Sequence, residues 1–276
     1  MSDHPNAYEK NQVSEIKKWQ NQEPGIVTKA LGFLSAPLVW GIRQIVPESA
    51  IRGALNFSCL AASALTDTED ILRAAKEKNR AVSSIGDLSA VDLEISDQIA
   101  ESVHNWALVI AGTEGGITGV MGLLGLAVDI PAVITFSLRT IKKIGICYGF
   151  NVKTQEEELF VLQILSAAGA NSLAEKTEAI VALKMIYNTV EKITWIKINE
   201  AAAAKVLSKE GFIMAVKNLA KQLGINLTKR KVLQTIPVIG GGIGAAVNAD
   251  FIGGVTWAAR RMYQKRWLEK NGCVVE

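Results

Sequence analysis

The run of residues 115–131, GGITGVMGLLGLAVDIP, constrains the fold of this chain more than any other feature. Glycine in a helix interior costs about 1 kcal/mol relative to alanine, so glycines spaced three or four residues apart imply close approach to another backbone or to a bilayer. A single carboxylate, Asp129, lies inside this apolar run. Because an unpaired buried charge costs more than the glycines do, Asp129 needs a partner. The run therefore predicts tightly packed helices around one acidic side chain.

Residues 232–259 form a second segment of the same kind, with several glycines and a single charged residue, Asp250. Basic residues precede this segment at positions 229–231 and follow it from Arg260 onward. Since a single membrane-crossing helix carries its positive charge mainly on one side, basic residues at both ends favour a hairpin whose ends share the cytosolic face. We therefore expect two glycine-rich helical hairpins packed together.

The spacing of apolar residues is helical along almost the whole chain, and no sustained alternation of apolar and polar residues predicts a sheet. The predicted fold class is all-α, a multi-helix bundle. We expect an N-terminal amphipathic helix within residues 1–24, a single all-α domain over residues 25–271 and a short tail over residues 272–276.

Three local signals predict where helices begin and end. Ser89 is placed to cap the start of a long helix. Gly149 suits the left-handed conformation that ends a helix over residues 131–148. Thr154 and Glu157 have the spacing of a capping box at the start of the next helix.

Composition excludes several classes of function. With 30 basic and 27 acidic residues, the chain lacks the overall charge of a nucleic-acid-binding protein. Its three cysteines form no CxxC pair and it has only two histidines, so neither a disulfide framework nor a metal site is expected. The glycines at 240–244 look like a dinucleotide-binding turn, but the further strands that such a fold needs do not follow. The polar N-terminal segment has no signal-peptide core. We therefore expect a cytoplasmic protein without a nucleic-acid partner, metal or cofactor.

Two interpretations of Asp129 stay open. As a functional carboxylate it would pair with Arg139, if Pro131 bends the helix, or with Asn248 of the second segment. Otherwise it caps a helix that begins at Pro131, since an acceptor just before proline is a common helix start. The candidate catalytic residues are Asp129, Arg139, Asn248 and Asp250.

Neither glycine-rich segment runs long enough without a charge or a proline to span a bilayer, which takes about 20 apolar residues. Aromatic residues interleaved with cations after the second segment suit a membrane interface, where rings and long basic side chains lie at headgroup depth. The expected contact residues are Trp257, Arg260, Arg261, Tyr263, Lys265, Arg266 and Trp267. In the alternative, a soluble bundle buries both segments and the basic helix end is solvated.

The chain contains five short motifs that together indicate a family. Four lie in the central part of the chain: Glu114-Gly115-Gly116 through Gly122-Leu123-Leu124-Gly125, Asp129-Ile130-Pro131, Leu138-Arg139 with Ile141, and Tyr148-Gly149-Phe150. The fifth lies near the C-terminus: Ile236-Pro237-Val238-Ile239-Gly240-Gly241 with Ala245, Asn248 and Phe251. This pattern resembles the EcsC family over about Leu31 to Leu268. One departure is Asn151, where the family tends to an acidic residue. The resemblance implies a helical bacterial protein, membrane-associated or cytosolic, from a family named after a gene beside that of an ABC-type exporter. It implies no established reaction and no catalytic residues.

These observations lead us to expect a non-enzymatic protein at the cytosolic face of the cell membrane, held peripherally or monotopically by lipid or by an integral membrane partner. The alternative is a small-molecule or lipid-binding protein, or an enzyme, with its site between the two hairpins around Asp129. A third hypothesis is a scaffold or homo-oligomer that packs its helices through glycine faces.

Overall fold

The computed structural model describes residues 5–23, 53, 55, 68–79, 81–118, 122–152, 155–170, 172–181, 222, 226, 240–273 and 275. In this part of the chain the helices are α1 (Ala7–Asn21), α5 (Glu69–Lys78), α6 (Leu93–Thr118), α7 (Gly122–Cys147), α8 (Gln155–Ala168) and α12 (Gly240–Lys270), with a 3₁₀ turn at Gly86–Ser89. A further helical segment covers residues 173–181. The described residues contain no strand, so the predicted all-α class is confirmed.

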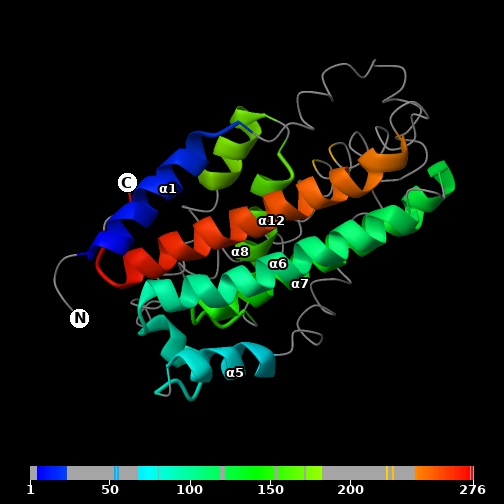
Figure 1. The fold of residues 1–276 in the computed structure, drawn as a ribbon. Coiled ribbons are helices and arrows are strands. Elements are labelled where there is room, and N and C mark those ends of the chain that lie inside the picture. Colours follow the sequence, from blue (N-terminus) through cyan, green and yellow to red (C-terminus); the bar gives the residue numbers. More distant parts are fainter. Residues whose placement is uncertain are drawn as a thin grey trace.

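Three long helices, α6, α7 and α12, form the centre of the bundle (Figure 1). Helix α6 packs against both α7 and α12, α8 packs against α12 and α7, and the outer helices α1 and α5 pack against α12 and α6 respectively. Figure 1 shows the C-terminal end of α6 and the N-terminal ends of α7 and α12 at the same end of the molecule. We call this the glycine-rich end, because it carries residues 115–118, 122–128 and 240–244.

The second glycine-rich segment differs from the predicted hairpin. Residues Gly240–Lys270 form one continuous helix, so no turn interrupts the segment within this range. The preceding residues 232–239 lie outside the described part of the chain. Packing of α12 along α6, α7 and α8 favours a single central helix, because a helix gains most of its stability from tertiary contacts rather than from its own propensity.

Asp129 does not lie at the start of a helix, so the predicted cap is wrong. Helix α7 begins at Gly122 and continues through Pro131 to Cys147. A proline inside a helix removes one backbone hydrogen bond and costs about 3 kcal/mol. Packing of α7 against α6, α8 and α12 offsets that cost, and local sequence alone does not reveal this packing.

The other predicted helix ends have mixed outcomes. Gly149 follows α7 with φ +80°, and a Cβ at this position would overlap the backbone nitrogen of Ser89, so the prediction of a glycine end is confirmed. Ser89 itself ends a 3₁₀ turn, and α6 begins later, at Leu93. Thr154 lies outside the described residues, and α8 begins at Gln155.

Small residues let the central helices approach closely. A Cβ on Gly145 of α7 would lie 2.6 Å from Cζ of Tyr263 on α12, so this position accommodates the tyrosine ring only as glycine. Tyr263 is fully buried and lies beside the rings of Phe150 and Phe160. This part of the core therefore lies where α7, α8 and α12 meet.

The N-terminal helix belongs to the same packed body. Ile16 of α1 is fully buried. The ammonium group of Lys176 donates hydrogen bonds to the carbonyl oxygens of Trp19 and, at 3.0 Å, of Gln22. This contact places a cation at the C-terminal end of α1, where the helix dipole is negative.

Candidate functional site

The structure describes two of the four predicted catalytic side chains, and it does not bring these two together. Arg139 and Asp250 are both partly buried, and no ion pair joins them. The side chains of Asp129 and Asn248 lie outside what the structure describes. On the continuous helix α7, Asp129 and Arg139 are separated by about 15 Å along the axis, which excludes a direct contact along a straight helix.

Most of the predicted membrane-contact residues are buried. Tyr263 and Trp267 are almost completely inaccessible, and Arg260, Arg261 and Arg266 are each 8% exposed. The ammonium group of Lys265 donates to the carbonyl oxygen of Val275 at 2.6 Å and lies 3.4 Å from the Glu269 carboxylate.

Only Trp257 of the predicted contact residues, 40% exposed, presents a substantial surface. The expectation is therefore corrected for the other six, because the helix that carries them is central to the bundle and its arginines are enclosed by neighbouring helices. Buried side chains do not contact lipid in this conformation.

The centre of the bundle contains a buried carboxylate, Asp97, that sequence reasoning missed. Its oxygens accept hydrogen bonds from the hydroxyls of Tyr8, at 2.8 Å, and Tyr148, at 2.5 Å, and from the side-chain amide of Gln264, at 2.7 Å. We call these four residues the Asp97 cluster. They come from α1, α6, the residue after α7, and α12, so the cluster joins four parts of the chain.

The electrostatics of the Asp97 cluster keep both tyrosines protonated. Burial, and then the nearby Asp97 carboxylate, raise the pKa of Tyr148 well above its usual value. The same causes raise the pKa of Tyr8. Since a phenol that stays protonated donates its hydrogen bond over a wide pH range, Asp97 keeps these donors wherever the protein is folded.

Arg261 extends the Asp97 cluster to α1. Its guanidinium donates to the side-chain oxygens of Gln264, at 2.9 Å, and Gln12, at 2.8 Å. It also lies 3.7 Å from the carboxylate of Glu15. Charge-assisted hydrogen bonds of this kind are stronger than neutral ones, and here they hold α1 against α12.

A second buried charged group joins α8 to α12. Arg266 donates two hydrogen bonds to Glu157, one to each carboxylate oxygen, at 2.7 and 2.9 Å. The guanidinium lies over the rings of Phe150 and Phe160, at 4.2 and 4.3 Å from their centroids. This geometry satisfies both charges within the core, and it explains why this basic residue of the C-terminal helix is not at the surface.

His104 and Trp257 form a third group, between α6 and α12. Their rings meet edge to face with centroids 5.3 Å apart. Burial, and then the nearby Arg260 guanidinium, lower the pKa of His104. The folded protein therefore favours the neutral form of this imidazole.

Lowering the pH through about 6.5 is expected to reduce the free energy of unfolding because of His104. In the unfolded chain the imidazole takes up a proton near pH 6.5, whereas in the folded protein its pKa is lower. Between these two pKa values the unfolded state binds more protons than the folded state. The free energy of unfolding therefore falls as the pH is lowered through this range. Urea unfolding at pH 7.5, 6.5 and 5.5 in phosphate-free buffer checks this, with His104→Gln expected to depend less on pH. Equal pH dependence in the two proteins would contradict the assignment.

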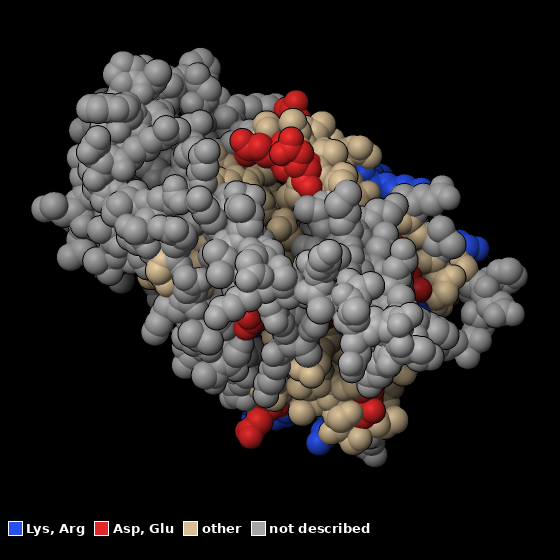
Figure 2. All heavy atoms as spheres, turned by 180° about the vertical axis from the view of Figure 1, so that it is seen from behind, with Lys and Arg blue, Asp and Glu red and all other residues tan. Residues whose placement is uncertain are grey.

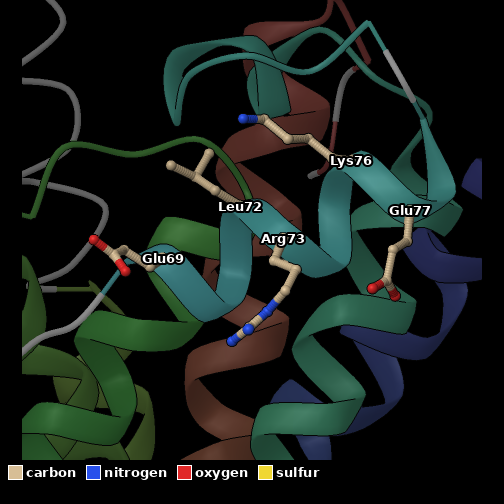
Figure 3. Close-up of a pocket in the computed structure, with 5 residues that line it drawn as sticks. All are labelled: Glu69, Leu72, Arg73, Lys76 and Glu77. Carbon is tan, nitrogen blue, oxygen red and sulfur yellow. The ribbon is translucent and has the colours of Figure 1, made fainter.

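A shallow surface pocket of about 730 Å³ lies over α5. Figure 3 shows the described residues that line it, Glu69, Leu72, Arg73, Lys76 and Glu77, all on this one helix. Their charges are balanced, and none of these five side chains is a buried polar group that points to a ligand. Within the described residues, no three histidine, cysteine or carboxylate side chains lie close enough together to hold a metal ion.

Comparison with known proteins gives the family of this chain. The chain matches the model of the EcsC protein family over residues 10–268 and belongs to this family. It is 25% identical over 262 residues to the uncharacterized protein YdbA of Bacillus subtilis (strain 168), covering 92% of this chain and 91% of that protein. It is 21% identical over 187 residues to protein EcsC of the same organism, covering 67% and 69%. No solved structure matches the chain significantly.

Proposed function

We propose that this EcsC-family protein binds peripherally or monotopically to the cytosolic face of a membrane, and that the glycine-rich end makes the contact. The observation that carries the proposal is the position of two charge-free parts of the chain at one end of the bundle (Figure 1). They are residues 115–118 and 122–128 of α6 and α7, and residues 240–249 of α12. Charge-free helix ends gathered at one end of a bundle are suited to insertion into a lipid interface or to contact with an integral membrane partner.

The outer face of the α6–α7 pair supports the proposal. Trp106 and Val109, three residues apart on α6, are 44% and 64% exposed. The Trp106 ring lies 5.9 Å from that of Phe136 on α7, and the ammonium group of Lys143 lies 5.6 Å from its centroid. An exposed tryptophan with a neighbouring cation is typical of side chains at headgroup depth. Trp106 and Val109 lie about 18 and 14 Å along α6 from its C-terminal end, so we add them as candidates for contact with headgroups and not for insertion.

The proposed insertion is shallow. Within the described helices, none combines the length and the apolar character that crossing a bilayer requires. Glu114 lies four residues before the end of α6 and Asp129 seven residues after the start of α7, which limits the charge-free depth to about 6–10 Å. Interfacial segments enter a membrane to about 5–10 Å.

Apolar contact is favoured over electrostatic attraction. Figure 2 shows the molecule from behind, with the described lysines and arginines at the edges and acidic side chains gathered near the top. On this face the described residues form no continuous basic surface. The segments of the proposed contact carry no charge, so we expect binding to persist at high salt, since screening weakens only the contribution of exposed charges.

Flotation of the purified protein with liposomes tests the proposal. We expect the protein to float with both neutral and anionic vesicles at low and at high salt. Leu124→Asp, in the charge-free segment, is expected to reduce the bound fraction about tenfold, because a carboxylate is costly in an apolar lipid environment. Val181→Asp, at a 49% exposed position on a different helix, serves as the matched control and should float like the parent protein.

The other hypotheses predict different results. Flotation only with anionic vesicles at low salt would assign the contact to basic side chains. A protein that never floats would contradict membrane binding and favour the alternative, a ligand-binding protein or enzyme with its site around Asp129. A mass that rises with protein concentration would favour a homo-oligomer that packs through glycine faces.

A further inference from the structure

The C-terminal half of α12 carries three equally buried arginines, and only two of them have hydrogen-bond acceptors among the described residues. Arg261 donates to Gln12 and Gln264, and Arg266 makes a two-pronged pair with Glu157. Arg260 is equally buried, at 8% exposure, yet within the described part of the chain it donates no hydrogen bond and forms no ion pair. Among the described residues, Arg260 is therefore a buried cation without an acceptor.

The missing acceptor is costly for Arg260. The Nε–H group of Arg260 is inaccessible to solvent and has no partner among the described residues, and a buried donor without a partner loses its full hydration. The Asp97 carboxylate is close enough to belong to the same electrostatic environment, but its oxygens already accept from two tyrosines and Gln264. The protein thus provides no free acceptor of its own to Arg260 among the described residues.

The partly exposed Trp257 lies beside Arg260. The guanidinium carbons of Arg260 and Arg261 lie 4.8 and 5.0 Å from the centroid of the Trp257 ring, which is 40% exposed. The His104 ring meets the same tryptophan at 5.3 Å, and its Nδ1 is buried without a described partner. Two cations and this imidazole therefore surround one accessible aromatic ring.

We propose that Arg260, His104 and Trp257 form a binding site for a phosphate group, with Arg261 adding positive charge. A guanidinium recognises phosphate through paired N–H donors, and a protonated imidazole supplies another donor from a different helix. A tetrahedral phosphate can accept hydrogen bonds from donors that approach from several directions. A single guanidinium already occupies both oxygens of a carboxylate, so a carboxylate fits these separated donors less well. The phosphate comes either from a soluble phosphate ester or from a lipid headgroup. The site itself does not depend on the proposed membrane contact.

Titration with inorganic phosphate, followed by calorimetry and by NMR of the imidazole signals, tests this site. The chain has only two histidines, so the His104 signal is assigned by comparison with His104→Phe. Bound phosphate should raise the pKa of His104, because a nearby anion favours the charged imidazole. Arg260→Met should weaken phosphate binding by about 10- to 100-fold, as expected for loss of a charge-assisted hydrogen-bonding group. Arg73→Met, which removes an exposed arginine of α5, is the control and should bind as the parent protein does.

A conservative variant and a competition experiment distinguish the remaining outcomes. Arg260→Lys keeps the charge but loses the paired donors, so it should bind phosphate with intermediate affinity, and it replaces Arg260→Met if that variant does not fold. Vesicles containing a phosphate-monoester lipid that compete with inorganic phosphate would identify a headgroup, whereas vesicles that do not compete would identify a soluble ester. No calorimetric signal and an unchanged His104 titration would overturn the proposal and leave water as the partner of Arg260. Equal binding by the Arg73 and Arg260 variants would overturn it as well.

Discussion

Asp97→Ala is expected to lower the free energy of unfolding by about 3–5 kcal/mol, which is a large share of the stability of a typical domain. The substitution leaves the buried Tyr148 hydroxyl without an acceptor and the Gln264 amide with only its longer hydrogen bond, 3.3 Å, to Gln12. Tyr8 loses its partner as well. Each buried donor left unsatisfied costs about 1–3 kcal/mol. Removal of the carboxylate also takes away the negative charge that lies near Arg260 and Arg261. Urea unfolding at pH 7.5, followed by circular dichroism, measures this loss.

Two comparisons make the Asp97 result specific. Asp97→Asn keeps the side-chain volume and one acceptor oxygen, so we expect a smaller loss than for alanine. Asp70→Ala removes an aspartate that is 60% exposed and paired with Arg73 on the surface of α5, where an ion pair contributes about 0–1 kcal/mol. If Asp97→Ala were no more destabilising than Asp70→Ala, the Asp97 cluster would not hold the helices together.

Glu157→Gln and Arg266→Met are each expected to destabilise the protein by about 3–5 kcal/mol, because either change leaves a buried charge without its counterion. The double variant Glu157→Leu with Arg266→Met should lose much less stability than the sum of the single changes. Replacing both members of a buried ion pair by apolar side chains of similar size is often close to neutral. Methionine also keeps part of the contact that Arg266 makes with Phe150 and Phe160.

A double-mutant cycle over this pair, with Glu157→Leu and Arg266→Met as its single variants, measures the coupling between the two side chains. Unfolding free energies of the parent, the two single variants and the double variant provide the four corners. A coupling energy near zero would show that Arg266 contributes through its packing on the aromatic rings alone. A strongly destabilised double variant would show that the charges themselves are required for this packing arrangement.

The long helix α6 illustrates how the sequence marks positions of a candidate site. Its buried side follows a regular helical spacing over six residues, namely Leu93, Asp97, Ala100, His104, Ala107 and Ala111. Two of the six are polar residues within an otherwise apolar stripe, and these two belong to the Asp97 cluster and to the proposed phosphate site. A polar residue on a core-facing stripe needs a partner, so the stripe marks both positions. Their partners just after α7 and on α12, however, lie more than 50 residues away along the chain, and helical periodicity contains no information on which helices meet.

The burial of the basic residues of α12 could not be predicted from the sequence. An alternation of arginines with aromatic residues predicts a surface that contacts water or lipid, since long charged side chains are seldom buried alone. In the folded protein, Glu157 of α8 and the α1 residues Gln12 and Glu15 interact with two of these arginines. The burial of this helix was decided by acceptors from other parts of the chain.

The amino-acid sequence by itself determined the all-α class, the membership of the EcsC family and the glycine end of α7, because these depend on residue spacing and on local backbone preference. The left-handed conformation at Gly149 is one such local property, since only glycine adopts it without strain. Only the tertiary structure decided that α12 is central, that α7 continues through Pro131, and that Asp97 gathers its donors from three other segments. Those features result from side chains distant in sequence that share one low-dielectric interior, where every buried charge and donor requires a partner.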